Sequence, residues 1–382
     1  MTRILWVVEK QFDISPDTAT WLEIISNLQP EYDVCLLTGY FTKKIQPNSI
    51  PGEVWYYNSS KVPFVNRLTT YFCQNRIFSS AMTSFRPQIV LFNTTNPLLL
   101  RNAARFKKEH GVKLVYDVRT LPVTDRKINR WVDPRLFKMA LQYVTRIFDG
   151  VTYITEEMRR YCKSAYNLPS HLSAVWTSGV APELFRPEPA VKNDQRFIAL
   201  YHGTIAKNRG LDCAVKAMSL LRDTDVSMHL LGNGDGVEQL KDLADKIGVA
   251  DRVLFSDAVK YEDVPHRINA ADVGILPFPN WPAWNTSSPI KLFEYLACSK
   301  PVIVTDIPAH KNVLNGRDFA FWVTEHNPEA FAKAILEAFH QKSRLDSIGC
   351  AARQFVINRY TWAQQAGHLH RFLNRLLQTE VQ

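Results

Sequence analysis

No stretch of this sequence could cross a lipid bilayer as a helix. Its apolar runs fall well short of the roughly 18 consecutive residues that a membrane span needs. The opening segment MTRILWVVEK holds a short apolar run that leads into charge rather than into a small-residue cleavage site, so no signal peptide is predicted. We therefore expect a cytoplasmic protein.

Closely spaced cysteines are missing as well. The six cysteines lie far apart with no Cys-x-x-Cys pair, and the ten histidines are scattered without a ligand-like cluster. This distribution predicts buried, reduced thiols rather than disulfides. It also predicts no metal site.

Excess acidic charge is absent, since Lys and Arg outnumber Asp and Glu by 46 to 37. The surplus lies entirely in the first half: residues 1–180 hold 23 basic and 14 acidic side chains, whereas residues 181–382 hold 23 of each. Such asymmetry indicates an anionic partner for the first half, such as a lipid surface, a phosphorylated acceptor or nucleic acid. A solvated basic surface without a partner is the alternative.

The chain alternates short β-branched runs with amphipathic stretches, which is typical of βα units on a parallel sheet. Its 382 residues favour two domains. We predict an α/β protein with two Rossmann-like domains facing each other across a cleft. The first covers residues 1–180, a proline-rich linker covers 181–196, and the second covers 197–355. The tail is predicted to be helical throughout, and its last part, 356–382, to cross back to the first domain.

Ligands of open parallel sheets bind beyond the carboxyl ends of the strands, so the loops that follow the strands matter most. One such loop is GTIAKNRGLD, after a predicted strand. Gly203 allows close backbone approach. Lys207 and Arg209 stand near a helix N-terminus, whose free N–H groups favour anions. This segment predicts a diphosphate site; a surface loop with two solvated cations is the alternative.

A glycine-rich turn, LLGNGDG, follows the next strand. Its spacing is G-x-G-x-G rather than the G-x-G-x-x-G of dinucleotide-binding folds, and no acidic residue closes a following strand at the expected distance. It therefore does not predict NAD binding, and a tight turn explains it equally well.

The segment SSPIKLFEYLACSKPVIVTD has a helix-start pattern, with Ser288 as a plausible N-cap and Pro289 at the first helical position. Lys291 and Glu294 are three residues apart and therefore share one helix face. Lys291 and the helix N-terminus can meet a phosphate, while Glu294 can accept two hydrogen bonds from the vicinal hydroxyls of a ribose. A surface i,i+3 pair is the alternative.

These segments, in this order, resemble the nucleotide-sugar domain of GT-B glycosyltransferases of family 4. The resemblance covers nearly all of residues 145–360 and includes WTSGVAPELFRP, which is similar to the hinge segment of that family. It implies an enzyme that transfers a sugar from a nucleoside diphosphate sugar, such as a UDP- or GDP-sugar, to an acceptor hydroxyl with retention of configuration. No further cofactor and no metal are implied. Residues 1–180 are then the acceptor-binding domain.

The resemblance and the basic first half together predict a saccharide or lipid-linked acceptor, in polysaccharide or cell-envelope glycan assembly. The protein would then work at the inner face of the cell membrane, held peripherally by anionic lipid, and would bind no nucleic acid. Two other functions remain open: a sugar-nucleotide epimerase on the same fold, and a catalytically inactive relative that only binds a sugar nucleotide.

The resemblance also implies residue roles in the second half. Glu294 matches the second acid of the family's E-x7-E element, which binds ribose, but the first acid falls on Thr286, so the element is incomplete. Arg209 takes the place of the usual diphosphate lysine, and Thr204 stands where an arginine is common. The implied donor-binding residues are Gly203, Thr204, Lys207, Gly232, Gly234, Val259, Lys260, Thr286, Ser287 and Ser288. The implied catalytic residues are Arg209, Lys291, Glu294 and Arg119.

In the first half, LVYDVRTLP aligns with a loop that faces the donor sugar in the family. Arg119 could stabilise the departing phosphate or orient a hydroxyl, and Asp117 could bind the acceptor or cap the loop. The loop after the first strand contributes Glu9, Asp13 and Ser15 as candidate acceptor contacts. Trp281 and Trp284, in the second half, could line the sugar or acceptor entrance or pack in the core.

Overall fold

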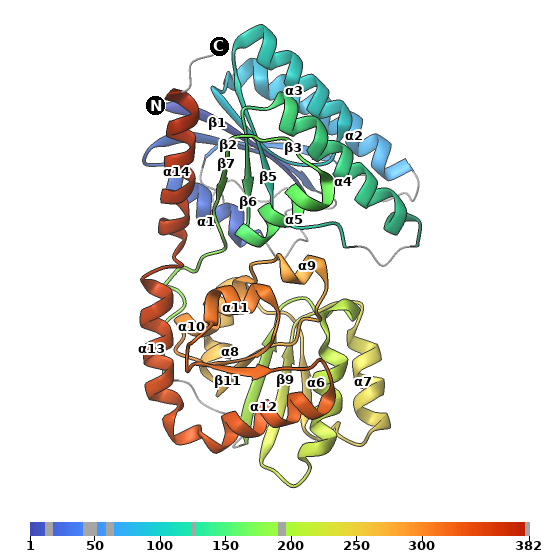
Figure 1. The fold of residues 1–382 in the computed structure, drawn as a ribbon, viewed down its shortest axis with the longest axis vertical. Helices are drawn as coiled ribbons and strands as arrows, with labels where there is room; N and C mark the ends of the chain where they lie inside the picture. The colour runs from blue at the N-terminus through green and yellow to red at the C-terminus, as the bar shows by residue number, and fades with distance from the viewer. Residues whose placement is uncertain (12–17, 41–51, 59–64, 124–126, 190–195, 379–382) are drawn as a thin grey trace. The chain divides into compact units, whose positions relative to one another are not determined.

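The computed structural model describes residues 1–11, 18–40, 52–58, 65–123, 127–189 and 196–378. The chain forms two compact units (Figure 1): unit 1 comprises residues 1–177 with 362–382, and unit 2 comprises residues 178–361. Each unit has one parallel sheet flanked by helices, so the prediction of an α/β protein with two Rossmann-like domains is confirmed. The cleft between them stays a prediction.

Unit 1 contains a seven-stranded sheet in the order β3-β2-β1-β4-β5-β6-β7, with every pair parallel. The chain builds outward from β1 in one direction and then returns to build from β4 in the other. The carboxyl ends of β1 and β4 therefore form a switch point, where ligands of such sheets bind. The strands are β1 Thr2–Gln11, β2 Tyr32–Tyr40, β3 Val54–Asn58, β4 Ile89–Asn93, β5 Lys113–Val118, β6 Gly150–Tyr153 and β7 Ser173–Val175.

The helices of unit 1 include one whose start lies beside this switch point. Asn96 caps it through Oδ1, which accepts the N–H groups of Leu98 and Leu99 at 3.1 and 3.3 Å. Its first residue is proline, which needs no N–H partner there. The cap fixes the backbone just after β4. The helices are α1 Ala19–Leu28, α2 Val65–Phe85, α3 Pro97–His110, α4 Lys127–Ile147, α5 Glu156–Tyr166 and α14 Trp362–Gln378.

The C-terminal helix α14 belongs to unit 1, as predicted. It packs against α1 and β7, and Tyr32 Oη donates a hydrogen bond to Asn374 Oδ1 at 3.1 Å. The tail is not one continuous helix, however. The helix α13, Leu345–Ile357, ends before α14 begins, because the backbone between them pairs elsewhere: Val180 N–H donates to Tyr360 O at 2.8 Å.

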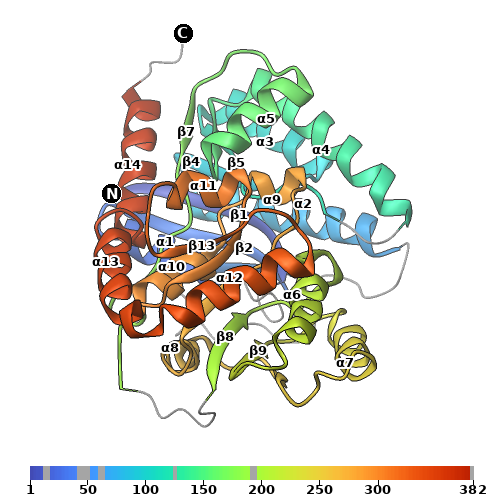
Figure 2. The ribbon, with the colours of Figure 1, turned by 60° about the horizontal axis from the view of Figure 1, so that its bottom comes forward.

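Unit 2 contains a six-stranded parallel sheet in the order β10-β9-β8-β11-β12-β13. Its switch point lies between β8 and β11. Every residue of β8 is buried, as expected for a central strand covered on both faces. Among the flanking helices, α12 lies beside α6 (Figure 2). The strands are β8 Phe197–His202, β9 Val226–Leu231, β10 Val253–Ser256, β11 Val273–Leu276, β12 Val302–Thr305 and β13 Ala320–Val323. The α-helices are α6 Leu211–Ala217, α7 Val237–Lys246, α8 Val264–Asn269, α9 Pro282–Asn285, α10 Ile290–Ala297, α11 Pro308–Leu314, α12 Pro328–His340 and α13, and short 3-10 turns cover Lys207–Arg209, Met218–Leu221, Tyr261–Asp263 and Lys342–Arg344.

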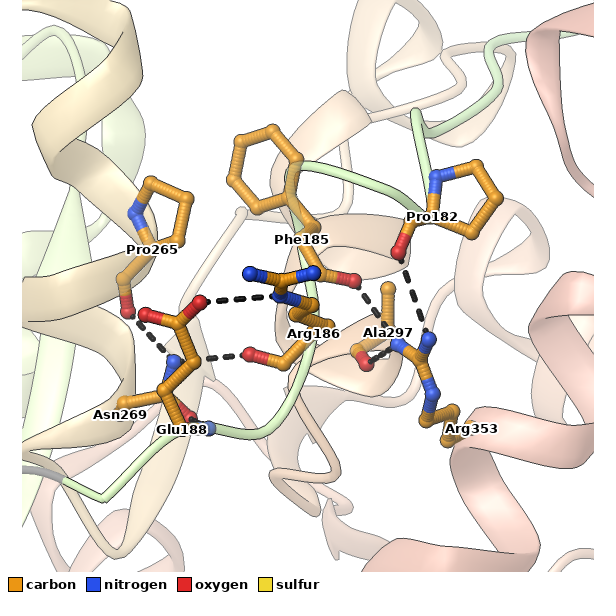
Figure 3. Close-up of polar contacts among 8 residues, drawn as sticks. All are labelled: Pro182, Phe185, Arg186, Glu188, Pro265, Asn269, Ala297 and Arg353. Atoms are coloured by element: carbon orange, nitrogen blue, oxygen red, sulfur yellow. Dashed lines mark hydrogen bonds and ion pairs between the residues drawn. The ribbon is translucent and has the colours of Figure 1, made fainter.

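The chain passes from unit 1 to unit 2 between Thr177 and Ser178, and the proline-rich segment that follows is fastened to unit 2. Arg353 of α13 donates to the carbonyl oxygens of Pro182 at 3.3 Å and Phe185 at 2.8 Å, and also to that of Ala297 at the end of α10 (Figure 3). Carbonyl groups in an irregular segment need such side-chain donors, because no helix or sheet provides their hydrogen bonds.

Asn269 at the end of α8 holds the next residues of the same segment. Its Nδ2 donates to Arg186 O at 2.9 Å and Pro265 O at 3.0 Å, and its Oδ1 accepts Glu188 N–H at 3.2 Å (Figure 3). Arg186 Nε in turn donates to Glu188 Oε1 at 2.9 Å. Residues 182–188, part of the predicted linker, thus bind to unit 2 through hydrogen bonds that composition alone does not reveal.

The cysteines are all free thiols. Cys35, Cys162 and Cys298 are buried as expected, but Cys73 and Cys350 are exposed, so the expectation of buried thiols is wrong for these two. Among the described residues, no helix combines the length and apolar character that a bilayer span would require.

Candidate functional site

At the carboxyl edge of the unit 2 sheet, the loop after β8 and the loop after β9 pack closely through their backbones. A Cβ on Gly232 would lie 2.0 Å from Gly203 O, and one on Gly234 would lie 2.1 Å from Ile205 O. Hydrogen bonds from Gly203 N–H to Leu231 O (2.9 Å) and from Ile205 N–H to Asn233 O (3.0 Å) fix the contact. The glycine spacing after β9 is therefore explained by loop packing, which holds the loop after β8 in place.

Lys291, in the first turn of α10, reaches this loop. Its Nζ lies 3.8 Å from the centre of the Tyr201 ring, and a Cβ on Gly203 would lie 3.0 Å from it. Burial lowers the pKa of Lys291 well below its usual range, and the charge of Arg209 adds to this, while Glu294 opposes it. No carboxylate lies within ion-pair distance of Nζ among the residues that the structure describes. This ammonium is thus a cation that an anionic ligand would stabilise.

Arg209 provides the second cation. Its guanidinium lies 4.4 Å from the Trp284 ring centre and 5.3 Å from that of Phe278, and its buried Nε has no hydrogen-bond partner within the part of the chain that the structure describes. Trp284 stacks on Phe278 with centroids 5.0 Å apart and donates from Nε1 to Asn208 O at 3.0 Å. Trp284 is therefore a core residue that supports Arg209, whereas Trp281 is 48% exposed.

Glu294 lies one turn further along α10 and is only 4% exposed. Its Oε2 is 3.2 Å from Nε2 of His202, the last residue of β8. Burial lowers the pKa of His202, against the opposing effect of Glu294, which favours a neutral imidazole at neutral pH. Tyr295 Oη accepts His202 N–H at 3.0 Å and donates to Leu200 O at 2.9 Å, which fixes α10 on the strand. The second carboxylate oxygen can accept hydroxyl hydrogen bonds.

The hydroxyl groups just before α10 form hydrogen bonds with backbone groups of unit 2. Thr286 Oγ1 donates to Pro282 O and Ser287 Oγ to Trp284 O, both at 2.8 Å. Ser288 Oγ accepts Ser178 N–H at 3.2 Å rather than capping the helix, which begins at Ile290 with Pro289 as its N-cap. The prediction of Ser288 as N-cap and of Pro289 as the first helical residue is therefore wrong by one position.

The remaining predicted donor residues follow β8 and β10 at the same sheet edge. Thr204 is half-buried, and its carbonyl accepts Tyr201 Oη at 2.7 Å. Lys207 is exposed, and its N–H donates to Asp235 Oδ1 at 3.3 Å. Val259 is half-buried and Lys260 is exposed. The cations that approach the centre of this site are thus Arg209 and Lys291 rather than Lys207 or Lys260.

Unit 1 has a pocket of about 270 Å³ at its own switch point. Glu9 lines this pocket from within β1 rather than from the loop that the sequence predicted, and its Oε2 accepts Thr94 Oγ1 at 2.7 Å and Thr95 N–H at 2.9 Å. Asp13 and Ser15 lie outside the described residues. The pocket is lined by Glu9, Lys10, Tyr71, Asn93, Thr94, Thr95, Tyr116, Asp117, Val118, Arg119, Thr120, Pro122, Asp133 and Phe137.

Asp117 and Arg119, at the end of β5, both line this pocket. Thr152 Oγ1 donates to Asp117 Oδ1 at 2.7 Å. The Arg119 guanidinium lies 3.5 Å from the Trp176 ring centre, and its Nη1 donates to Trp176 O at 2.8 Å. Burial raises the pKa of Asp117 to about 6, although Arg119, Thr152 and Trp176 oppose the shift. Burial likewise lowers the pKa of Arg119 to about 10.

The sequence interpretation missed Asn93, Thr94 and Thr95, which line the pocket beside Glu9. Their signal was available in part, because Asn93 ends the apolar strand QIVLFN and the two threonines directly follow it. What the sequence does not give is the position of β4 next to β1, which brings them to the switch point.

No group of three or more His, Cys, Asp or Glu side chains suited to a metal ion occurs among the described residues. The triplet Asp223-Thr224-Asp225 has the Asp-x-Asp pattern of some metal sites, but it lies just before β9, at the amino ends of the strands. That is the edge opposite the one where Lys291 and Arg209 lie.

Comparisons with known proteins bear on both units. Residues 184–355, all in unit 2, match the family described as "Glycosyl transferases group 1". The chain is 25% identical over 253 residues to the GDP-mannose-dependent α-(1-6)-phosphatidylinositol monomannoside mannosyltransferase of Mycobacterium tuberculosis. That alignment covers 62% of this chain and 66% of the relative, so this chain spans just under two thirds of its length.

Solved structures match the chain over nearly its whole length. Sucrose-phosphate synthase of Thermosynechococcus elongatus matches with a TM-score of 0.81 at 15% identity, covering all of both chains. HepE of Anabaena, crystallised in complex with UDP, matches with a TM-score of 0.75 at 16% identity, covering 98% of this chain and 100% of HepE. At these identities the likeness concerns the fold, which is that of GT-B glycosyltransferases.

Proposed function

Because residues 184–355 form a glycosyl transferases group 1 domain within a GT-B fold, we propose that this chain transfers a sugar from a nucleoside diphosphate sugar to an acceptor hydroxyl in glycan biosynthesis. The observation that carries the proposal is the arrangement around α10. There, two cations that pair with no carboxylate of the described residues lie near one buried carboxylate at the switch point of unit 2.

The diphosphate would bind against Gly203, where the missing side chain lets the backbone and Lys291 approach it closely. As the bond between the sugar C1 and the phosphate oxygen breaks, negative charge grows on the leaving diphosphate. Lys291 and Arg209 stabilise that charge in a half-buried setting, where electrostatic interactions are stronger than in water. The acceptor oxygen bonds to C1 on the same face, which retains the configuration, and its proton passes to the leaving phosphate.

Glu294 would bind the ribose. A carboxylate that is held by α10 and contacted by His202 keeps one oxygen for the two vicinal hydroxyls. Thr286 stands in place of the first acid of the E-x7-E element and donates its hydroxyl to Pro282 O, so the contacts of the transferred sugar would be made by other residues. One relative is named for GDP-mannose and one structural neighbour was crystallised with UDP, so GDP and UDP are both candidates for the nucleotide of the donor.

The experiment that tests the proposal compares GDP and UDP with their 2′-deoxy forms by calorimetry. We expect the wild-type protein to bind one of the two nucleotides and to lose affinity for its deoxy form. In Glu294→Gln the affinity should fall by about tenfold, since a hydrogen bond to a charged group contributes roughly 1.5–3 kcal/mol. Discrimination against the deoxy form should nearly vanish in that variant.

If Glu294→Gln still discriminates as strongly as the wild type, the ribose assignment is wrong. Turnover decides between the remaining functions. Radiolabelled UDP- and GDP-sugars incubated without acceptor should be hydrolysed slowly by a transferase. They would be converted to another sugar nucleotide by an epimerase, and would be bound but left unchanged by an inactive relative.

We also propose a saccharide or lipid-linked acceptor at an anionic membrane surface, supported by the surplus of nine positive charges in residues 1–180. The full chain should sediment with vesicles that contain anionic lipid, and binding should fall as salt is raised. Equal binding to neutral vesicles would remove the membrane from the proposal and leave the transferase activity untouched.

A further inference from the structure

The helix α10 carries both Lys291 and Glu294, on which the proposed donor site depends, but it is too short to hold its own position. It has eight residues, and its N-cap residue, Pro289, has no side-chain acceptor to offer. A helix of about two turns is unstable without packing partners. Whatever holds α10 in place therefore also determines where its two charged side chains lie.

The start of α10 is held by the segment through which the chain enters unit 2. Ser178 is the first residue of unit 2, and it forms two reciprocal hydrogen bonds with Ser288. The Ser178 N–H donates to Ser288 Oγ at 3.2 Å, and Ser178 Oγ donates to Ser288 O at 2.7 Å. Ser178 is 2% exposed and Ser288 is 9% exposed, so little water is available to replace either bond.

The end of α10 is tied to the same entering segment by Arg353. Its guanidinium donates to Ala297 O, at the last residue of α10, and to the carbonyl oxygens of Pro182 and Phe185 (Figure 3). The donors of a guanidinium lie in one rigid plane, so these three carbonyl groups keep a fixed relation to one another. Both ends of α10 are thus fastened to residues 178–185.

The last residues of unit 2, where the chain returns to unit 1, contact the middle of α10. The ring of Tyr360 stacks on that of the buried Phe293, with centroids 4.7 Å apart and 24° between the planes. The returning segment also pairs with the entering one. Val180 N–H donates to Tyr360 O at 2.8 Å, and Val180 forms a parallel bridge with Thr361. The two segments therefore form one paired element that packs against α10.

We propose that the paired segments through which the chain enters and leaves unit 2 position α10, and that Ser178 and Tyr360 are positioning residues for donor binding. Neither residue has to touch the nucleotide, because Ser178 acts through Ser288 and Tyr360 acts through Phe293. The proposal rests on the proposed transferase function and deepens it, since it makes nucleotide affinity depend on the connections between the two units. By linkage, a nucleotide bound at α10 in turn stabilises both segments.

The first test measures GDP and UDP binding to the full chain by calorimetry, well below the melting temperature. Ser178→Ala removes the hydroxyl that Ser288 O accepts but keeps Lys291 and Glu294. We expect the affinity for the nucleotide that the wild type binds to fall about fivefold, a modest coupling between distant sites. A merely structural serine would lower the melting temperature and leave the affinity of the folded protein unchanged.

Thr224→Ala is the matched control. Thr224 Oγ1 donates to Leu221 O at 2.6 Å, which is again a hydroxyl-to-carbonyl bond within unit 2. Thr224 lies just before β9, however, at the amino ends of the strands and away from α10. This variant should also lower the melting temperature, but it should bind nucleotide with the affinity of the wild type.

Tyr360 allows a comparison of a conservative and a disruptive change. Tyr360→Phe keeps the ring that stacks on Phe293 and should bind nucleotide as the wild type does. Tyr360→Leu loses the stack and should bind about fivefold more weakly. A difference between these two variants would locate the effect in the ring contact with α10.

Hydrogen exchange tests the reciprocal effect. Adding nucleotide to the wild type should slow exchange of the Ser178 and Val180 amides, which donate to Ser288 Oγ and Tyr360 O rather than to a ligand. In Ser178→Ala this slowing should shrink, whereas any slowing in α12 should persist.

The proposal is overturned if Ser178→Ala and Tyr360→Leu bind nucleotide as the wild type does, or if Thr224→Ala loses as much affinity as Ser178→Ala. It is also overturned if nucleotide leaves exchange of residues 178–180 unchanged. Failure of the wild type to bind either GDP or UDP would instead refute the donor site itself, and this proposal with it, so the two failures are distinguishable.

Discussion

Replacing Lys291 by methionine is expected to weaken nucleoside diphosphate binding by roughly 100-fold, the loss of about two charge-assisted hydrogen bonds. The same change should raise the melting temperature of the ligand-free protein. Both effects follow from one observation: burial and the charge of Arg209 lower the pKa of Lys291. Methionine fills the space beside the Tyr201 ring without a charge to desolvate.

The pH dependence of this stabilisation has a definite sign. The unfolded lysine holds its proton up to its ordinary pKa of 10.5, whereas the folded one releases it at lower pH. The wild type is therefore penalised most below the lowered pKa of the folded lysine, and the gain from Lys291→Met should shrink as pH rises from there toward 10.5. Melting curves at several pH values, with and without UDP and GDP, measure both effects.

Lys241→Met is the control for this prediction. Lys241 lies on the surface of unit 2 and pairs with Glu238 at 3.0 Å, an exposed pair worth at most about 1 kcal/mol. Its replacement should change neither nucleotide affinity nor melting temperature appreciably. Wild-type affinity in Lys291→Met, or a fall in its melting temperature, would show that Lys291 is an ordinary packed lysine.

Much of the fold could be predicted because its signals are local. Apolar β-branched runs and helical periodicity indicated two parallel sheets, and the three-residue spacing of Lys291 and Glu294 indicated a shared helix face. The break between α13 and α14 escaped prediction, since it depends on a pairing of Val180 with residues 360 and 361, far away in the sequence. Composition cannot reveal such a partner.

The sites were predictable to different degrees for the same reason. In unit 2 the important residues follow strands directly, so Gly203, Arg209 and Glu294 stood out. The support of Arg209 by Trp284 depends on a stack between separate segments, and the sequence left the role of that tryptophan open. In unit 1 the pocket exists only because β4 lies beside β1, and the raised pKa of Asp117 within it is a consequence of burial.

Gly232→Ala is expected to have the largest effect on stability, with a loss above about 4 kcal/mol or no folded unit 2 at all. Its φ of 143° lies in a region that residues with a Cβ rarely adopt, and the new Cβ would lie 2.0 Å from Gly203 O. Because the obstacle is backbone, no side-chain rotation can relieve it. The loop after β8 or the loop after β9 must therefore shift, which disturbs the backbone contact that positions Gly203.

Gly316→Ala separates the cost of an unfavourable φ from the cost of the backbone clash. Gly316 also has a positive φ, 69°, but among the described residues no atom outside Gly316 and its two chain neighbours lies within 4 Å of the added Cβ, so this variant should lose only the roughly 1–2 kcal/mol of left-handed backbone strain. Melting temperature and nucleotide affinity should be compared for both variants. If Gly232→Ala is destabilised no more than Gly316→Ala and binds nucleotide normally, the two loops do not support each other. If it folds but loses nucleotide affinity, the loop contact itself holds the diphosphate site in place.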